Sequence, residues 1–227
     1  HLNKKGYEPE LIQCHVAGRN LWFASKYFGN TPYVISEHWS GYLNGHFDRL
    51  PFYFRRFLIR KMNRAKVLTC ASSYLAESLI EIGVNKRIEI LQNVIQYKEK
   101  KEGNISDGFT FLIVSDLVDE VKNISGVIEA FSLLKIEDPK IKLVIVGGGK
   151  DLVNLERLVA EKKIRSRVVF HGRCVQEVVQ DHFLQADCVI VNSHIETYSM
   201  VTIESILSGC PVIATRCGGP EQFINAD

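Results

Sequence analysis

The chain has 227 residues, of which 46% are hydrophobic and 24% are charged, and its formal net charge is +2. These values are typical of a globular protein that is long enough to bury one or two hydrophobic cores. No apolar run reaches the roughly 18 to 20 residues that span a bilayer, which excludes a transmembrane helix. The first residues also lack the apolar stretch of a secretory signal.

Charge is unevenly distributed along the chain. Residues 1–103 contain 16 Lys and Arg against 9 Asp and Glu, whereas residues 104–227 contain 12 against 17. Halves of opposite charge indicate two domains with different partners. The basic half suits an anionic partner, such as a membrane surface or a phosphorylated acceptor.

The first half alternates short apolar runs with amphipathic stretches. This alternation predicts strands at 10–14, 33–37, 67–70 and 88–91, and helices at 20–28, 52–63 and 73–82. The polar stretch that follows, residues 98–108, has no periodicity and is typical of a linker. We therefore expect a first domain of residues 1–97.

One segment of this half combines basic and aromatic side chains. Residues 49–66, from Arg49 to Lys66, include seven basic residues and no acids, interleaved with four aromatic rings. A basic aromatic helix is typical of peripheral contact with an anionic membrane. The pattern equally fits a helix whose rings pack into its own domain while its arginines face water. The residues leave both interpretations open.

The second half, residues 109–227, has the same rhythm. It predicts strands at 109–114, 141–146, 168–170, 189–192 and 211–214, helices at 123–136, 151–162, 175–184 and 200–207, and the start of another helix at 218–224. Strict alternation favours the α/β class, with two Rossmann-like, doubly wound parallel sheets. Ligands of such sheets bind at the carboxyl ends of the strands, so we expect a site in a cleft between the domains. Because the chain does not begin with Met and the pattern stops at Asp227 without a closing element, we expect both domains to be incomplete.

The six cysteines form no C-x-x-C pair and no Cys/His cluster at zinc spacing. Most of them lie in or beside apolar stretches. This predicts buried free thiols in a reducing cytosol, without a disulfide or metal role.

The strand at 141–146 runs into a glycine-rich turn, residues 147–149. A dinucleotide-binding fingerprint needs another glycine at position 152, which is Leu152, so a nicotinamide or flavin cofactor is disfavoured. The turn either lets a ligand approach the backbone or simply connects strand and helix tightly.

Candidate site residues gather in residues 192–215, which predict a strand end, a polar loop, a helix and a Gly-x-Pro turn. Glu196 lies in the loop, and Glu204 lies two turns into a mostly apolar helix. The N–H groups from Ser199 to Val201 stand at the helix start, where anions bind, and a carboxylate at Glu204 needs a partner such as a pair of ribose hydroxyls. Alternatively, Glu196 caps the helix and Glu204 lies on a solvated face. Spacing alone does not separate the two.

This stretch resembles the E-x7-E motif, with its following Gly-x-Pro turn, of the family-four retaining glycosyltransferases (glycosyl transferases group 1), which have the GT-B fold. The resemblance extends over nearly the whole chain in the order of the family's motifs. Further matching segments are residues 66–73, 83–84, 90–94, 143–149, 168–172 and 218–221.

The resemblance implies three residues at the reacting centre. Glu196 contacts hydroxyls of the transferred sugar, and His38, after the strand at 33–37, faces the acceptor. Lys122 stabilises the charge that builds on the departing nucleoside diphosphate, a role in which a fixed cation is effective. Without the resemblance, Lys122 is interpreted as a solvated lysine and His38 as a structural loop residue.

The resemblance also implies the contacts that bind the donor. Glu204 accepts hydrogen bonds from the ribose, and the N–H groups of Ser199, Met200 and Val201 hold the diphosphate. Gly148 belongs to the glycine-rich turn of the same site.

Two positions depart from the family pattern. Asp116 stands where the family has Arg, which removes half of the usual cationic clamp. Ser199 stands where it has Gly, which is tolerated if the backbone there is helical. Recognition of the base is implied around residues 173–175 through backbone contacts, so side chains do not identify the base.

We therefore predict a cytoplasmic, retaining glycosyltransferase that moves a sugar from a UDP- or GDP-linked donor to a glycan or lipid-linked saccharide of a surface polysaccharide. Lipid-linked acceptors are common in the family, which favours peripheral membrane contact through residues 49–66. Metal independence is expected because no Asp-x-Asp motif is present to hold a diphosphate-bound cation. Neither a cofactor nor a nucleic-acid partner is expected.

Two alternatives to this function remain. One is a non-catalytic domain that binds a nucleotide sugar or a partner protein, which Asp116 favours. The other is a nucleotide-sugar epimerase of the same fold, which the E-x7-E motif disfavours.

Overall fold

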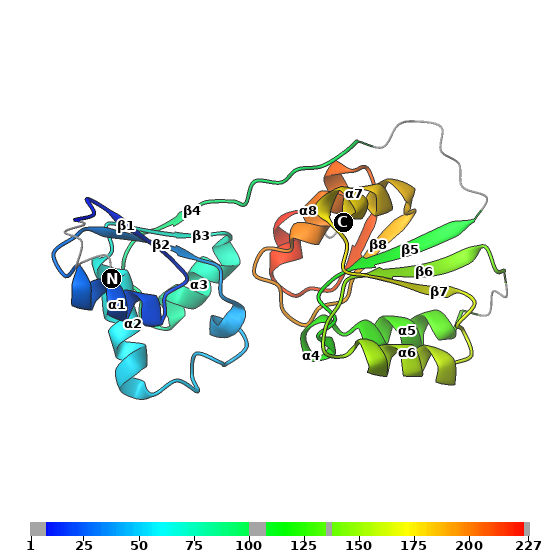
Figure 1. The fold of residues 1–227 in the computed structure, drawn as a ribbon, viewed down its shortest axis with the longest axis horizontal. Coiled ribbons are helices and arrows are strands. Elements are labelled where there is room, and N and C mark those ends of the chain that lie inside the picture. Colours follow the sequence, from blue (N-terminus) through cyan, green and yellow to red (C-terminus); the bar gives the residue numbers. More distant parts are fainter. Residues whose placement is uncertain (1–7, 100–107, 135–137, 225–227) are drawn as a thin grey trace. The chain divides into compact units, whose positions relative to one another are not determined.

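The computed structural model describes residues 8–99, 108–134 and 138–224. The chain divides into two compact units between Asn93 and Val94 (Figure 1). Of the predicted linker, residues 100–107 lie outside the described residues.

The first unit contains a parallel sheet of four strands in the order β1-β2-β3-β4. Every strand and helix predicted for this half is present, with ends that differ by at most two residues. The elements are β1 (Ile12–His15), α1 (Arg19–Tyr27), β2 (Tyr33–Glu37), the 3-10 turn η2 (Ser40–Tyr42), α2 (Phe52–Arg64), β3 (Val67–Cys70), α3 (Ser73–Glu81) and β4 (Ile88–Ile90).

The three helices of this unit lie on one face of its sheet (Figure 1). Connections between parallel strands are right-handed, so strands that are added one after another in the same direction leave their helices on the same side. A single buried cluster joins that face. It includes Leu21 of α1, Leu58 of α2, Leu75 of α3, and Ile35 and Leu68 of the strands.

The second unit contains a parallel sheet of five strands in the order β7-β6-β5-β8-β9. Its strands are β5 (Phe109–Val114), β6 (Ile141–Val146), β7 (Val168–Gly172), β8 (Cys188–Val191) and β9 (Val212–Ala214). Its helices are α4 (Asp119–Lys122), α5 (Ile124–Ser132), α6 (Leu152–Glu161), α7 (Gln176–Gln185) and α8 (Met200–Leu207), followed by the 3-10 turn η3 (Gly219–Gln222).

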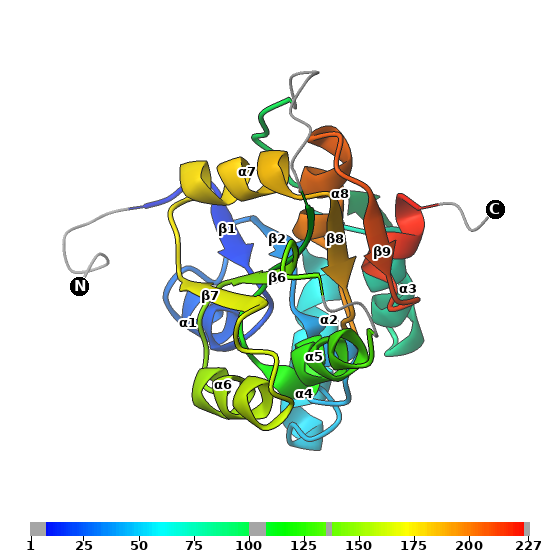
Figure 2. The same ribbon diagram turned by 90° about the vertical axis from the view of Figure 1, so that its right-hand side faces the viewer.

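The order in which strands are added to this sheet reverses at β5. Because of this reversal, helices cover both faces of the sheet. The chain first adds β6 and β7 on one side of β5 and then crosses to add β8 and β9 on the other. Right-handed connections therefore place α5 and α6 on one face and α7 and α8 on the opposite face (Figures 1 and 2). Alternate side chains of the central strands serve the two cores: Ile113 and Ile145 pack in the cluster of α5 and α6, and Leu112 and Val144 pack with Phe183 of α7. The predicted α/β class and parallel, doubly wound arrangement are confirmed here.

Two local predictions for this half are wrong, and one helix is not predicted at all. The single-turn helix α4 is not expected, because four residues carry no apolar period. A residue in left-handed conformation, Asn123 with φ 46°, separates α4 from α5, and α5 ends at Ser132 instead of residue 136. Residues 219–222 form a 3-10 turn, not the start of an α-helix, within the part of the chain that the structure describes.

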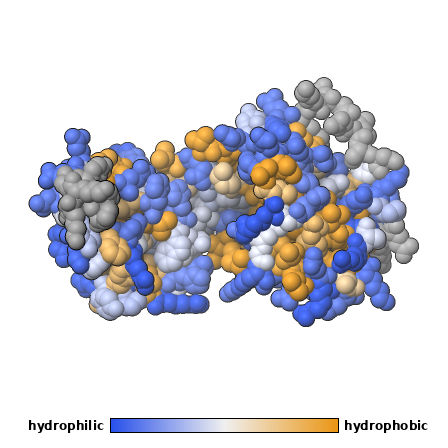
Figure 3. Space-filling model, in the orientation of Figure 1, coloured by the Kyte–Doolittle hydropathy of each residue, from blue (hydrophilic) through white to orange (hydrophobic). Residues whose placement is uncertain are grey.

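All six cysteines are free thiols, as predicted, and five of them are buried. Within residues 8–99, 108–134 and 138–224, no group of three or more His, Cys, Asp or Glu residues is placed to hold a metal ion. In the same ranges, no helix has the length and apolar character that crossing a membrane requires. Hydrophobic residues on the face seen in Figure 3 form patches that hydrophilic residues separate.

The segment before the undescribed linker residues packs on the second unit. Gln180 Nε2 of α7 donates a hydrogen bond of 2.7 Å to the carbonyl oxygen of Gln96. Lys98 Nζ forms an ion pair of 2.6 Å with Asp181 on the same helix. These contacts explain why the division between the units comes before Val94 rather than at residue 98.

Candidate functional site

The reversal of strand order in the second sheet creates a place where two loops leave side by side. Neighbouring strands β5 and β8 pair at Leu112 and Val189. The loops that follow them therefore start together at the carboxyl edge, one leading to α4 and α5 and the other to α8 on the opposite face. In open α/β sheets, ligands bind at this point.

The two loops meet in an ion pair. Lys122 Nζ, at the end of α4, lies 2.5 Å from Glu196 Oε1 in the loop before α8, and the side chains are 26% and 15% exposed. The same oxygen accepts a hydrogen bond of 2.7 Å from Ser193 Oγ. Glu196 thus bonds to Lys122 and Ser193 instead of capping α8. Because both charges are largely shielded from solvent, their attraction is screened less than that of a surface pair.

Backbone hydrogen bonds fix the loop that carries Glu196. His194 N donates over 2.8 Å to the carbonyl oxygen of Val121, which ties the loop to α4. On the other side, Glu196 N donates to Cys217 O, and Gly219 N donates to Glu196 O. The carboxylate is therefore held from both sides, as an electrostatically preorganised site requires.

The residue before α8, Ser199, has φ 62° and ψ 72°, which is the left-handed region. The condition under which a serine is tolerated here, a helical backbone, is therefore not met. A non-glycine residue in this region costs about 1–2 kcal/mol. The hydroxyls of Ser199 and Thr202 lie 2.8 Å apart and form a hydrogen bond that offsets part of this cost. The turn ends the Glu196 loop, so that Met200 and Val201 open α8 with the positive end of the helix dipole at this loop.

The carboxylate of Glu204 is buried in α8, with 7% of the residue exposed. Its Oε1 accepts a hydrogen bond of 2.7 Å from Nε2 of Gln176, the first residue of α7. Burial raises the pKa of Glu204 above its ordinary value of 4.5, and the hydrogen bond from Gln176 partly offsets this rise. The alternative of a solvated Glu204 is wrong.

The glycine-rich turn after β6 packs against the loop after β5. A Cβ on Gly147 would overlap the carbonyl oxygen of Ser115, so this glycine permits close approach of two backbone segments. Gly148 faces a side chain instead, because a Cβ there would lie 3.0 Å from Cγ of Arg173.

Asp116 lies exposed in the loop after β5 and has a cationic partner. Arg173 Nη2 lies 2.9 Å from Asp116 Oδ1 and donates a second hydrogen bond of 2.9 Å to the carbonyl oxygen of Gly148. Since Arg173 follows β7, it links the loops after three neighbouring strands.

In the first unit, His38 follows β2 at the carboxyl edge of the sheet, and His15 ends the neighbouring β1. Partial desolvation lowers the pKa of His38, although the residue is exposed, and the charge of His15 lowers this pKa further. The residue before it, Glu37, is fully buried, and its carboxylate accepts hydrogen bonds from Ala17 N, His38 N and the hydroxyl of Tyr42. Burial raises the pKa of Glu37, and these hydrogen bonds oppose the rise. Glu37 thus anchors the backbone that carries His38.

Sequence patterns do not predict three residues that contact the candidate site. Ser193 has a local signal, because its hydroxyl is three residues from Glu196 within one loop. Gln176 has none, since it reaches Glu204 from 28 residues away. Glu37 has none either, because acidic residues are almost always exposed unless a partner is present.

Models of two protein families match the chain. The family described as glycosyl transferases group 1 matches residues 95–227, which is more than half of the chain. The family described as glycosyltransferase family 4 matches residues 2–98.

Relatives and a solved structure agree with these matches. The N-acetyl-alpha-D-glucosaminyl L-malate synthase of Bacillus anthracis is 29% identical over 177 residues, covering 73% of this chain and 46% of that protein. The lipopolysaccharide 1,6-galactosyltransferase of Escherichia coli is 25% identical over 237 residues, covering 97% of this chain and 60% of that protein. A mutant of S. aureus TarM, in complex with fondaparinux, alpha-GlcNAc-glycerol and UDP, has a TM-score of 0.80 at 17% identity, covering 99% of this chain and 45% of that one. The chain thus spans about half the length of the proteins it matches.

Proposed function

Because this chain belongs to the glycosyl transferases group 1 family, we propose that it is the part of a retaining glycosyltransferase that binds a nucleotide-sugar donor and directs the sugar to its acceptor. The donor is UDP- or GDP-linked, and the acceptor is a glycan or lipid-linked saccharide of a surface polysaccharide. The transfer requires no metal ion.

The observation that carries this proposal is the ion pair of Lys122 and Glu196 at the reversal point of the second sheet. It places an oriented cation and an oriented carboxylate beside the start of α8. An anionic leaving group bound at the helix start is then close to a fixed positive charge. Such an arrangement suits the departure of a nucleoside diphosphate.

The chemistry follows from where charge develops. When the bond between the sugar and the diphosphate breaks, negative charge grows on the phosphate oxygens, and the Lys122 ammonium stabilises it. Removing one preorganised group of this kind costs about 3–4 kcal/mol in other enzymes. Glu196 orients a hydroxyl of the transferred sugar, and the buried carboxylate of Glu204 accepts a hydrogen bond from the ribose.

On the acceptor side we assign His38. Its lowered pKa keeps more of the imidazole neutral near pH 7, so that a ring nitrogen can accept a hydrogen bond from an acceptor hydroxyl. Glu37 positions this residue through the hydrogen bond from His38 N to the buried carboxylate.

The similar proteins support the choice of donor and acceptor. UDP and alpha-GlcNAc-glycerol are bound in the TarM mutant, and the Escherichia coli relative is named a lipopolysaccharide 1,6-galactosyltransferase. A nucleoside diphosphate and a lipid-linked glycan are therefore the ligands that we assign to this chain.

Calorimetric titration of UDP, GDP and ADP tests the donor site. One nucleotide should bind, and Lys122→Ala and Glu204→Gln should each weaken its affinity about tenfold, because the first removes a charged donor and the second replaces a charged acceptor by a neutral one. Lys162→Ala, at the far end of α6, is the matched control and should leave the affinity unchanged.

Three other outcomes would count against this proposal. Binding that both variants leave unchanged would place the nucleotide elsewhere. If the nucleotide binds but the chain releases no diphosphate from the matching nucleotide sugar when an acceptor is present, a non-catalytic domain is favoured. Failure of all three nucleotides to bind would favour a partner-binding domain.

We also propose peripheral membrane contact through residues 49–66, on the cytoplasmic side. The aromatic side chains of this segment divide into two groups: Phe54 and Phe57 pack against the core of the first unit, whereas Phe52 and Tyr53 are 64% and 76% exposed. The two exposed rings support the proposed contact. The six free thiols suit a reducing compartment.

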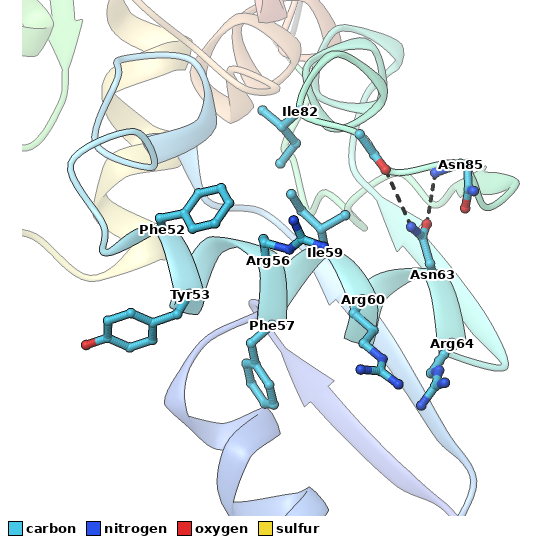
Figure 4. Close-up of a pocket in the computed structure, with 11 residues that line it drawn as sticks. Phe52, Tyr53, Arg56, Phe57, Ile59, Arg60, Asn63, Arg64, Ile82 and Asn85 are labelled. Carbon is cyan, nitrogen blue, oxygen red and sulfur yellow. Dashed lines mark hydrogen bonds between the residues drawn. The ribbon is translucent and has the colours of Figure 1, made fainter.

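A groove of about 920 Å³ runs beside these exposed rings. Figure 4 shows Phe52 and Ile59 directed toward Ile82, while Tyr53, which also lines the groove, points away from Ile82. Three arginines at helical spacing line it. They are Arg56, Arg60 and Arg64 of α2. Exposed rings next to arginines suit the boundary between headgroups and acyl chains of an anionic bilayer.

Co-sedimentation with vesicles tests this contact. The chain should bind vesicles of phosphatidylcholine with phosphatidylglycerol, and should bind pure phosphatidylcholine less, with the difference falling at high salt. Replacing Phe52 and Tyr53 by Ser, or Arg56 and Arg60 by Ala, should reduce binding, whereas Arg165→Ala on the second unit should not. Equal binding to both vesicle types, or no binding, contradicts the proposal.

A further inference from the structure

The loop after β5 carries an anion at a position where the resemblance implies a cation. Asp116 replaces the family's Arg, so Lys122, at the end of α4, is the one cation that residues 115–122 supply to a bound diphosphate. We infer that Arg173, from the loop after β7, supplies the second cation of the diphosphate site. This inference rests on the proposed donor site and adds a binding residue to it.

The geometry around Arg173 is specific. Its Nη2 lies 2.9 Å from Asp116 Oδ1 and donates a hydrogen bond of 2.9 Å to the carbonyl oxygen of Gly148. Its side chain lies against Gly148, whose missing Cβ would come within 3.0 Å of Cγ. Asp116 and Gly148 thus hold the guanidinium of Arg173 at the loop after β5, where the resemblance implies an arginine.

This ion pair is poorly explained as a stabilising contact. The side chains of Arg173 and Asp116 are 72% and 64% exposed, and ion pairs of this kind contribute little to stability. Both contacts use the same nitrogen, Nη2. Nε and Nη1 of Arg173 make no hydrogen bond with any residue that the structure describes. A guanidinium has five donors in a planar fork that matches phosphate oxygens, so donors remain for an anion.

The position of Arg173 in the fold supports the same role. Strands β5, β6 and β7 lie side by side in the sheet (Figure 1). Asp116, Gly148 and Arg173 follow these strands at the carboxyl edge, which is also the edge of Lys122 and Glu196. A ligand along this edge is within the row of loops that Arg173 joins.

Charge explains why a diphosphate is the favoured anion. A single carboxylate balances the guanidinium, whereas a nucleoside diphosphate carries more negative charge and offers several oxygens to the same fork. When a diphosphate binds, the guanidinium of Arg173 therefore either leaves Asp116 for the phosphates or contacts both. A ligand without phosphate gains nothing from this group.

A rescue experiment tests the inference. Calorimetry compares UDP, UMP and uridine, or the guanine series if GDP is the nucleotide that binds, with the wild type, Arg173→Ala and the double variant Arg173→Ala with Asp116→Arg. Arg173→Ala should weaken the diphosphate about tenfold and the nucleoside not at all. The double variant should recover most of the loss, because it returns a guanidinium to the loop after β5. Arg165→Ala, exposed and after α6, serves as the matched arginine control.

Each contrary result has a distinct meaning. An unchanged affinity of Arg173→Ala for the diphosphate overturns the inference while the donor site stands. If Arg173→Ala weakens the affinity for the diphosphate and for the nucleoside equally, Arg173 contacts the base. If the double variant does not recover affinity for the diphosphate, Arg173 maintains the structure of the loop. Either result overturns the inference. If the wild type binds neither UDP nor GDP, the proposed donor site itself fails.

Discussion

Lys122 and Glu196 are 74 residues apart in the sequence, and their side chains meet at 2.5 Å. The contact exists because β5 and β8 are neighbours at the reversal of strand order, so that the loops after them share one edge of the sheet. A cation and a carboxylate are thereby held beside the start of α8 before any ligand arrives.

The ion pair should contribute measurably to stability. Lys122→Ala leaves the partly buried carboxylate of Glu196 with the Ser193 hydroxyl alone, and we expect the free energy of unfolding to fall by about 1 kcal/mol. Urea denaturation of the wild type, Lys122→Ala, Glu196→Gln and the double variant should give a coupling energy of about 1 kcal/mol. Strictly additive effects would mean that the two side chains do not stabilise each other.

Position 199 should tolerate substitutions in an order set by its left-handed backbone. Ser199→Val should lower the free energy of unfolding by about 2 kcal/mol or more, because a β-branched residue is strained at φ 62°. Ser199→Gly relieves the backbone strain, but it removes the hydrogen bond to Thr202 and makes the unfolded chain more flexible. We therefore expect the free energy of unfolding to change by no more than about 0.5 kcal/mol. Thermal unfolding measures both, and a Val variant as stable as the Gly variant would refute the strained backbone.

The raised pKa of Glu204 should make stability depend on pH. A pKa that is higher in the folded than in the unfolded chain means that the folded chain holds the proton more tightly. This stabilisation is present below the ordinary pKa of 4.5 and is lost as the pH rises through the raised pKa. We expect Glu204→Gln to lack that fall when unfolding is measured from about pH 4 to about pH 7. Parallel pH profiles of the two proteins would contradict the raised pKa.

The hydroxyl of Tyr42 should support the buried carboxylate of Glu37. Tyr42 OH donates a hydrogen bond of 2.9 Å to Glu37 Oε1, and both residues are buried. Tyr42→Phe should lower the free energy of unfolding by about 1–3 kcal/mol, because a buried carboxylate loses a donor. The matched control is Tyr53→Phe, the same chemical change on a ring that is 76% exposed, which should alter stability by less than about 0.5 kcal/mol. Equal effects of the two variants would remove the anchoring role of Glu37.

Most of the fold could be predicted because its signals are local. Strands such as β2 and β6 contain short apolar runs, residues 33–35 and 143–146, and helices such as α2 begin after a proline and carry an apolar stripe. Elements without such a signal are not predicted correctly. The helix α4 is only one turn long, and Pro220 in η3 is compatible with both an α-helix and a 3-10 turn.

The candidate site divides in the same way. Spacing pointed to Glu196 and Glu204, the family resemblance added Lys122, and the structure places Lys122 in contact with Glu196. The sequence did not predict the left-handed turn at Ser199, because this turn depends on how the loop of Glu196 connects to α8. Nor could it show which partner each carboxylate selects.

The sequence alone determined the class of the fold, the order of its elements and the family to which the chain belongs, because periodicity and motifs are properties of neighbouring residues. Only the tertiary structure decided that Gln176 meets Glu204, that Arg173 meets Asp116 and that Glu37 is buried. Those contacts depend on the order of strands in the sheet and on the burial that packing imposes. Neither quantity is encoded in any one segment of the chain, since both arise only when segments far apart in sequence are brought to the same edge.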